Sequence, residues 1–417
     1  MTRRICIVTA GHLSTCPRML KAADALTDVG HAVRVVSAQF TPWATQADVE
    51  VRRRRAKKWQ WTVVNYDRRT ARRVYVASGV RFRATRRVVS MVGPMRCPMP
   101  LVVRAYSRVY PELLRAALAD PTDLFYGGTT GALAVIAAAA RRRNVPYGLD
   151  LEDFHSAEHD DSPTVQFVHS LTRRIEQDVL STAQFVTAGS VAIARAYAEM
   201  YGIRPIPINN TFSLPTTPPP LTVNPKSGLR LYWFSQTIGP GRGLEDVVRA
   251  VGVAGIPGEL HVRGNPLPGY LSDLYSLTAQ TAPQLRLVHH HPAPPDEMIA
   301  LCREYDVGLA TERREPLNHA LSLSNKMCTY VLAGLAVACT DTPGQRPLAQ
   351  DLGEGVCSYA PGDIATLAAG LKRWAQDKAL LARAKAEAWE AAQRRWHWEH
   401  TQERGALLDA VKGAVLE

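Results

Sequence analysis

The stretch LSNKMCTYVLAGLAVACTD (323–341) places Asn325 and Lys326 just ahead of a short apolar helix. Ser324 or Asn325 can cap this helix, and Gly334 can end it in a left-handed conformation. The free N–H groups at a helix start carry partial positive charge and favour anions such as phosphate, and Lys326 adds a full charge. The stretch therefore predicts an anion site, and a surface lysine beside an ordinary cap is the alternative.

A second glycine-rich stretch, SQTIGPGRGLEDVVRA (235–250), follows an expected strand and opens an expected helix. Gly241 and Gly243 let the backbone turn tightly and approach a ligand. The guanidinium of Arg242 can meet a phosphate through two hydrogen bonds, and the helix beginning near Leu244 offers N–H groups to the same anion. The spacing GxGxG differs from the dinucleotide fingerprint GxGxxG, so an ordinary structural turn is an equal alternative.

Histidines stand in two places where chemistry is conceivable. His155, with Asp153 beside it, follows the expected strand of GLDLEDFHSAEH (148–159), and a histidine satisfied by a backbone carbonyl is the alternative there. Three consecutive histidines occupy 289–291, but neighbouring residues of a strand point to opposite faces, so they form a poor metal site. No DxD motif stands at an expected strand end, and the sequence predicts no metal.

The elements that must position these residues alternate along the chain. Expected strands are followed by expected helices of 10–15 residues, which predicts parallel sheets built from βαβ units. The segment 214–228 has five prolines in fifteen residues and is typical of a semi-rigid linker. We therefore expect two doubly wound α/β domains facing a cleft, at 1–213 and 229–395, with 396–417 forming a C-terminal helix that returns to the first domain. Ligands of such sheets bind outside the carboxyl ends of the strands.

Composition excludes several classes of protein. The 417 residues are 46% hydrophobic and 21% charged, as in ordinary globular proteins. The longest apolar runs are about half of the roughly 18 residues that a membrane-spanning helix needs. The start MTRRICIVTAG lacks a signal-peptide pattern, and the seven scattered cysteines suit a reducing compartment, so we expect a cytoplasmic protein.

The net charge of +12 is concentrated in one region. Residues 52–115 hold 18 Lys or Arg and two acids, a balance of +16, whereas the rest of the chain holds 32 basic and 36 acidic residues, a balance of −4. Trp59 and Trp61 follow the first basic cluster. The region is interpreted either as a contact with an anionic membrane surface or acceptor, at the inner face of the membrane, or as a solvated Arg-rich helical surface. No recognised motif accompanies it for specific nucleic-acid binding.

The order and spacing of these motifs resemble the family 4 glycosyltransferases, which are retaining enzymes of the GT-B fold. The resemblance covers nearly the whole chain. It includes the opening TAGHLSTCPRMLKAADALTDVGHAVRVVS (9–37), the segment GLDLEDFHSAEH, the stretch AGSVAIARAYAEMYG (188–202) with INNTF after it, the turn GRG and the helix start NKMCTYVLAGLAVACTD.

The resemblance implies roles for matching positions only. Arg242 and Lys326 would hold the donor diphosphate, and His155, with Asp153 beside it, would lie near the transferred sugar. The first loop would meet the acceptor and the diphosphate. The remaining implied contacts are Gly241, Gly243, Ser324 and Asn325 on the donor side, and Gly11, His12 and Arg18 on the acceptor side.

The chain departs from the family in its paired glutamates. The corresponding positions are Leu321 and Thr329, so both carboxylates are missing. Thr329 can hydrogen-bond one donor hydroxyl, less strongly than a carboxylate does. Glu312 or Glu315, in ATERREPLNHALS (310–322), is a candidate substitute acid, and a solvated loop carboxylate is the alternative.

The resemblance implies transfer of a hexose from a nucleotide-diphosphate sugar to an acceptor hydroxyl, by front-face attack with retention and without metal or other cofactor. Arg242, Lys326 and the helix amides would stabilise the leaving diphosphate electrostatically. The acceptor would belong to a cell-surface glycan, a glycolipid or a natural product, and its identity is open, as are the donor base and sugar.

Three other functions remain as alternatives. The loss of acids at Leu321 and Thr329 suits a non-catalytic, nucleotide-sugar-binding pseudoenzyme. An NADP-dependent oxidoreductase would use the GPGRG turn, with Arg263 meeting the 2′-phosphate, although the glycine spacing is off by one. An epimerase or phosphorylase of the GT-B fold is the third.

Overall fold

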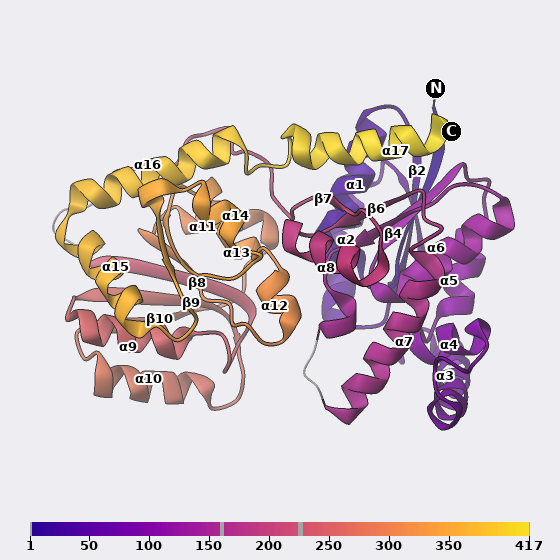
Figure 1. Ribbon diagram of the computed structural model, residues 1–417, viewed down its shortest axis with the longest axis horizontal. Helices are drawn as coiled ribbons and strands as arrows, with labels where there is room; N and C mark the ends of the chain where they lie inside the picture. Colours follow the sequence, from indigo (N-terminus) through magenta and orange to yellow (C-terminus); the bar gives the residue numbers. More distant parts are fainter. Residues whose placement is uncertain (1, 159–161, 224–227, 417) are drawn as a thin grey trace. The chain divides into compact units, whose positions relative to one another are not determined.

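The computed structural model describes residues 2–158, 162–223 and 228–416. The chain divides into two compact units, Met1–Asn209 with Thr401–Glu417, and Asn210–His400. Each unit has one parallel β-sheet covered by helices (Figure 1). The proline-rich segment 214–228 belongs to the second unit, although 224–227 lies outside the described residues. The predicted fold class, two doubly wound α/β domains, is confirmed.

The first unit contains a seven-stranded sheet in the order β3-β2-β1-β4-β5-β6-β7, with every pair parallel. The order reverses between β1 and β4, which makes their carboxyl ends the topological switch point. Both strands are almost fully buried, because helices cover them on both faces. The strands are β1 (Arg4–Thr9), β2 (Ala32–Gln39), β3 (Gln60–Asn65), β4 (Leu124–Gly128), β5 (Gly148–Leu151), β6 (Phe185–Ala188) and β7 (Ile206–Pro207).

Local signals in the sequence set the helix ends of this unit. For example, the hydroxyl of Ser190 caps α8 by accepting from the N–H of Ile193, and Gly202 ends that helix with φ 68°. The helices are η1 (Leu13–Thr15), α1 (Pro17–Asp28), α2 (Pro42–Arg55), α3 (Arg72–Val92), α4 (Met99–Tyr106), α5 (Tyr110–Ala117), α6 (Thr130–Arg143), η2 (His155–Ala157), α7 (Pro163–Val179), α8 (Val191–Tyr201), η5 (Thr401–Gly405) and α17 (Ala406–Leu416).

The end of the chain belongs to the first unit. The buried carboxylate of Glu403 accepts hydrogen bonds from the backbone N–H and the side-chain amide of Asn209, at 2.5 and 2.8 Å. Leu407, Val411 and Ala414 on α17 are buried as well. The last helix is therefore part of this core.

The second unit contains a six-stranded parallel sheet in the order β10-β9-β8-β11-β12-β13. Its switch point lies between β8 and β11. Alternate residues of β8 belong to two different apolar clusters: Leu231 and Trp233 lie in one cluster, and Tyr232 lies in the other. Both faces of this strand are therefore covered. The strands are β8 (Leu229–Ile238), β9 (Gly258–Pro266), β10 (Leu285–His290), β11 (Val307–Ala310), β12 (Ala336–Thr340) and β13 (Val356–Tyr359).

The helices of the second unit alternate with these strands. The charged C-terminal region is two helices, because Asp377 ends one and its carboxylate caps the next by accepting from the N–H of Leu380. The helices are α9 (Leu244–Ala254), α10 (Tyr270–Thr281), η3 (Pro295–Glu297), α11 (Met298–Cys302), α12 (Leu317–Leu321), α13 (Asn325–Leu332), α14 (Arg346–Gln350), η4 (Gly353–Gly355), α15 (Ile364–Gln376) and α16 (Lys378–Arg394).

The basic region differs from the expectation in one respect. Trp59 is buried, and its indole N–H donates to Asp24 at 2.9 Å. Trp61 is half-buried on β3, where its N–H donates to Ser37 at 2.8 Å. Both indole N–H groups are therefore engaged within the first unit, so these two tryptophans give no support to the membrane interpretation of the basic region, which stays a prediction. Among the described residues, no helix is both long and apolar enough to cross a bilayer.

Candidate functional site

In the second unit the predicted donor residues gather at the switch point. The loop after β8 holds Gly241, Arg242 and Gly243, and the loop after β11 begins at Thr311. The two loops are joined by the hydroxyl of Thr311, which donates to the carbonyl of Arg242 at 2.5 Å. A ligand of this sheet is expected at this edge, where neighbouring loops diverge.

The turn before α9 depends on glycine. Gly241 and Gly243 have φ of 76° and 75°, a conformation that side chains rarely adopt. A Cβ at Gly243 would also lie 2.7 Å from both the Cβ and the carbonyl oxygen of Thr311. The helix starts at Leu244, as predicted, so its first N–H groups follow this turn. The Arg242 guanidinium, partly exposed, forms no ion pair in the described part of the chain.

The start of α13 adds a second group of donors. Ser324 is the N-cap residue, but its hydroxyl does not cap the helix and donates instead to Glu312 at 2.9 Å. Lys326 forms an ion pair with the same carboxylate, and its Nζ lies 5.7 Å from the centre of the Trp233 ring. Asn325 is exposed. This helix start therefore keeps backbone N–H groups and carries Lys326 beside them.

Glu312 is an ionised carboxylate within this cluster. Burial acts to raise its pKa, but the charge of Lys326 and the hydrogen bonds from Lys326 and Ser324 outweigh burial, so its pKa falls to about 2. The sequence identified both residues but not their contact. The signal that could have revealed the pair is their position: Glu312 lies just after β11, and Lys326 lies at the start of the helix that leads to β12.

The two positions at which the sequence resemblance implies glutamates hold Thr329 and Leu321, which offer a donor sugar no carboxylate. Thr329 is buried, and its hydroxyl donates to the carbonyl of Asn325 at 2.9 Å, within its own helix. Leu321 is the last residue of α12. Because the Thr329 hydroxyl already donates its proton, its oxygen can only accept a hydrogen bond from a hydroxyl of the sugar donor. That contact stays a prediction.

The switch point of the first unit has a parallel arrangement. The N–H of Ala10 donates to the hydroxyl oxygen of Thr129 at 3.0 Å, which joins the loops after β1 and β4. Thr129 has φ 70°, an unusual conformation for a β-branched residue. Sequence reasoning missed Thr129, although the segment GGTTG after a strand could have indicated it. Gly11 lies in the first of these loops, and its carbonyl accepts from the N–H of Ala38 at 3.1 Å.

His155 lies past the carboxyl end of β5 and is buried. Neither ring nitrogen has a hydrogen-bond partner within the described residues, and Nδ1 lies 3.5 Å from a carboxylate oxygen of Glu158. Burial acts to lower the pKa of His155, but the carboxylates of Glu158, Glu176 and Asp153 together raise it above 6.5. Sequence reasoning had not identified Glu158 or Glu176.

His12 and Arg18, two of the predicted acceptor-side residues, form hydrogen bonds and ion pairs within the protein. Nδ1 of His12 lies 2.8 Å from Asp48, and its Nε2 accepts from the N–H groups of Phe40 and Thr41 at 3.0 Å, which assigns the proton to Nδ1. The Arg18 guanidinium pairs with Asp150 through two nitrogens, at 2.5 and 2.8 Å.

The third nitrogen of Arg18 donates to the carbonyl of Ile208 at 2.6 Å. These contacts shape the strand ends, and direct contacts of His12 or Arg18 with an acceptor stay predictions. The predicted site residues thus form two groups, one in each unit.

The side chains of His289, His290 and Arg263 contact other groups of the second unit. His290 lies 2.8 Å from His261, and His289 lies 3.0 Å from the carbonyl of Gly264. Arg263 donates from Nε to the hydroxyl of Tyr232 at 2.7 Å and from Nη1 to the carbonyl of His291 at 2.9 Å, so two of its three nitrogens are engaged within the protein. In the described ranges, no three His, Cys, Asp or Glu side chains are placed to hold a metal ion.

Comparisons with known proteins give likeness in fold. No protein-family model matches the sequence, and a search of curated proteins finds no match. Among solved structures, HepE from Anabaena in complex with UDP aligns over 100% of both chains with a TM-score of 0.63 and 15% identity. Sucrose-phosphate synthase from Thermosynechococcus elongatus covers 98% of both chains, with a TM-score of 0.67 and 13% identity.

A glycosyltransferase from Rickettsia africae aligns with 100% of this chain and 99% of its own, with a TM-score of 0.61 and 10% identity. HepE has also been solved with UDP-glucose. The chain therefore has the fold of GT-B glycosyltransferase structures over its full length.

Proposed function

We propose that this protein is a glycosyltransferase that uses a nucleotide-diphosphate sugar. The observation that carries the proposal is the cationic switch point of the second unit, where Arg242, Lys326 and the starts of α9 and α13 surround one edge of the sheet. Helix N-termini and paired cations suit a diphosphate. UDP-linked hexoses are the first donors to test, because HepE binds UDP and UDP-glucose within the same fold.

The proposed chemistry is metal-independent transfer with retention. Cleavage of the anomeric C–O bond builds negative charge on the diphosphate, and Arg242 and Lys326 are fixed charges that stabilise it as it forms. His155 is proposed to act on the transferred sugar, with Asp153 beside it, and the acceptor hydroxyl attacks from the face that the diphosphate leaves. Gly11, His12 and Arg18 remain the proposed acceptor-side residues.

We place the reaction in the cytoplasm, with an acceptor from a glycan, a glycolipid or a natural product. The basic region 52–115 is proposed to contact the inner face of an anionic membrane. Support comes from its charge of +16 and from the exposed surface of α3.

The first test is a thermal-shift panel with UDP, GDP, ADP, their common sugar conjugates and NADPH. Wild type is compared with Arg242→Ala and Lys326→Ala. A ligand at a hundred times its Kd adds about 2.7 kcal/mol to the free energy of unfolding. We expect one diphosphate to raise the Tm by several degrees in wild type and in neither variant. No shift with any diphosphate, or a shift with NADPH alone, would overturn the proposal.

A nucleotide-sugar-binding pseudoenzyme is the second candidate, because Leu321 and Thr329 replace the family's two carboxylates. The two functions differ in turnover. Release of UDP from the stabilising UDP-sugar, measured with and without acceptor candidates and compared with His155→Gln, separates them. Binding without any release of UDP would assign the protein to the second class.

A further inference from the structure

The exposed face of α3 is partly apolar. Val76, Val80 and Val88 are 52%, 55% and 45% exposed, and Met91 near the helix end is 70% exposed. Spacings of four and eight residues place the three valines in one stripe along the helix. An exposed face in water is normally polar, so a continuous apolar stripe indicates a surface that something covers.

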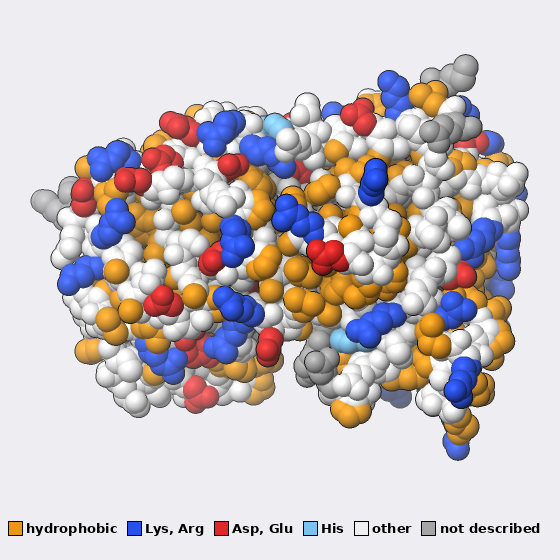
Figure 2. All heavy atoms as spheres, viewed as in Figure 1, with side chains coloured by type: hydrophobic (Ala, Val, Ile, Leu, Met, Phe, Trp, Pro, Cys, Tyr) orange, Lys and Arg blue, Asp and Glu red, His pale blue; other side chains and the backbone are white. Residues whose placement is uncertain are grey.

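The surroundings of this stripe carry uncompensated positive charge. Residues 68–111 contain eleven arginines and no Asp or Glu. Arg81 pairs with Glu112, but within the described part of the chain no ion pair joins the exposed arginines of α3, which are Arg72, Arg73, Arg83 and Arg87. Figure 2 shows hydrophobic and Lys or Arg side chains side by side where this helix reaches the surface. The stripe and its charges together suit an anionic interface.

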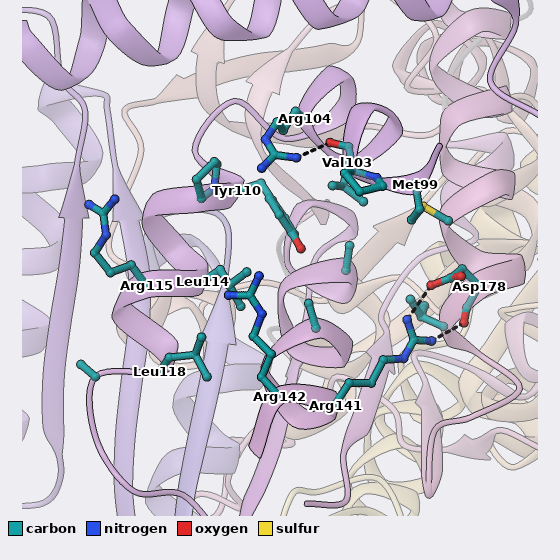
Figure 3. A pocket seen from close by; sticks show the side chains of 16 residues that line it. Met99, Val103, Arg104, Tyr110, Leu114, Arg115, Leu118, Arg141, Arg142 and Asp178 are labelled. Atoms are coloured by element: carbon teal, nitrogen blue, oxygen red, sulfur yellow. Dashed lines mark hydrogen bonds and ion pairs between the residues drawn. The ribbon is translucent and has the colours of Figure 1, made fainter. Parts of the chain in front are cut away.

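A groove lies between α4, α5 and α6 of the same unit. Its volume is about 800 Å³, and Figure 3 shows the side chains that line it. One part of its wall is apolar, with Val103 from α4, Leu114 from α5 and Ala134 and Ala138 from α6. The α4 helix, which forms one wall of the groove, also packs against α3.

Cations also line the groove. The ring of Tyr110 lies between the guanidinium groups of Arg104 and Arg142 in Figure 3, and the Arg104 Cζ is 5.9 Å from the ring centre. Arg141 pairs with Asp178 at 2.8 Å and is therefore compensated. Arg104 and Arg142 form no ion pair with the described residues. Arg115 also lines the groove and forms no ion pair within the described ranges. The groove thus combines an apolar wall with the positive charges of Arg104, Arg115 and Arg142.

We propose that the stripe of α3 rests on an anionic membrane and that the groove binds one anionic phospholipid from it. The lipid phosphate would lie at Arg104 and Arg142, and one acyl chain would follow the apolar wall. A free phosphate would satisfy the arginines but leave the wall exposed, and a nucleic acid would leave Met91 and the valines uncovered. The inference deepens the membrane contact proposed above and does not depend on the transferase reaction.

The test is co-sedimentation with vesicles of phosphatidylcholine, alone or with 30% phosphatidylglycerol. Arg104→Gln/Arg142→Gln removes the phosphate contacts, and Ala138→Trp fills the groove while keeping every charge. The matched control, Arg373→Gln/Arg383→Gln, removes two exposed arginines from the second unit. Each arginine near an anionic surface contributes about 1 kcal/mol, so the groove pair should weaken binding about thirtyfold and the control pair by no more than about twofold.

A second arm separates a lipid from a free anion. We expect dihexanoyl phosphatidylglycerol to raise the Tm of wild type but not of Ala138→Trp, and inorganic phosphate to raise neither. A phosphate shift equal to the lipid shift would overturn the proposal, as would equal binding to vesicles without phosphatidylglycerol.

Equal binding by the groove and control pairs would also overturn the proposal. So would duplex DNA binding that replaces vesicle binding, or a dimer in solution that Met91→Glu dissociates. Because no donor or acceptor is present, failure here leaves the proposed transferase function standing, and failure of the nucleotide panel leaves this inference standing.

Discussion

Lys326 and Glu312 are the pair on which the second-unit site depends. A buried ion pair is costly to break, because the remaining charge loses its partner without regaining water. The Glu312 carboxylate also offsets the positive charge that Lys326 presents to a ligand. Glu312 therefore acts in two ways: it fixes the position of the lysine, and it competes with the diphosphate for the lysine's charge.

Lys326→Met should lower the free energy of unfolding at pH 7 by about 3–5 kcal/mol, because it strands the Glu312 carboxylate. The pH dependence has a definite sign. The folded pKa of Glu312 is about 2 against an ordinary 4.5, so its stabilisation is complete above 4.5 and is lost as pH falls toward 2. The shift corresponds to about 3 kcal/mol.

Urea unfolding between pH 2 and 7 measures this effect, and Lys326→Met/Glu312→Gln is its control. The double variant should recover stability at pH 7 and lack the acid-dependent loss. Equal unfolding free energies for wild type and Lys326→Met at pH 7 would contradict the prediction.

Glu312→Gln tests what else the carboxylate does. Removing its charge frees Lys326, so the affinity for UDP alone should stay equal or rise. If Glu312 also accepts from the donor sugar hydroxyls, the affinity for the UDP-sugar should fall about tenfold or more, since hydrogen bonds to a charged group contribute about 1.5–3 kcal/mol. Calorimetric titration with both ligands separates these effects, and parallel changes for the two would remove Glu312 from the sugar contact.

At the scale of elements, the site is held by two turns at strand ends. The turn before α9 needs left-handed residues at Gly241 and Gly243, and Thr311 from the neighbouring strand closes over the second of them. Thr129 provides the corresponding link between β1 and β4 in the first unit. Both switch points are thus fastened by a threonine hydroxyl at the end of a central strand.

Gly243→Ala should therefore be much more damaging than Gly241→Ala. Both substitutions place a residue with a side chain in a left-handed backbone conformation, which costs about 1–2 kcal/mol of stability. Only position 243 adds a collision, with Thr311 at 2.7 Å, whereas a Cβ at position 241 meets no atom within 4 Å. We expect a further loss of about 1–3 kcal/mol and weaker UDP binding for Gly243→Ala. Tm values and UDP titrations of both variants check this, and similar losses at the two positions would count against the contact.

At the scale of the molecule, the last helix belongs to the first unit although the chain reaches it from the second. The first unit is therefore discontinuous in sequence and the second is continuous. A chain that ends after His400 would lack the buried side chains of Leu407 and Val411 and the Glu403 bonds to Asn209.

Truncation after His400 should destabilise the first unit selectively. Burial of one Leu or Val side chain contributes about 1.5–3 kcal/mol, so the loss should be several kcal/mol. Limited proteolysis should cut the first unit and spare 210–400. Leu407→Ala should reproduce part of the loss, and Leu416→Ala should not, because Leu416 is 71% exposed. Equal protection of both units in the truncated chain would show that α17 is dispensable.

Much of the fold could be predicted from local patterns. Buried apolar strands, helices of 10–15 residues and their glycine ends are properties of short segments, because burial on both faces and capping need only neighbours in sequence. The start of α9 at Leu244 and the left-handed Gly334 after α13 were predictable for this reason. The partners of the Trp59 and Trp61 indoles were not predictable in this way, because Asp24 and Ser37 come from other elements.

The sequence by itself determined the two α/β halves, the basic region and the residue types at the strand ends. The tertiary structure decided which of those residues meet. It paired Glu312 with Lys326, set His155 among carboxylates, and committed Arg18 to Asp150. It also formed the groove beside α4, by packing α5, α6 and the end of α7 around it. The reason is physical: a side chain's charge state and partners depend on elements brought together by sheet order, which local propensity does not encode.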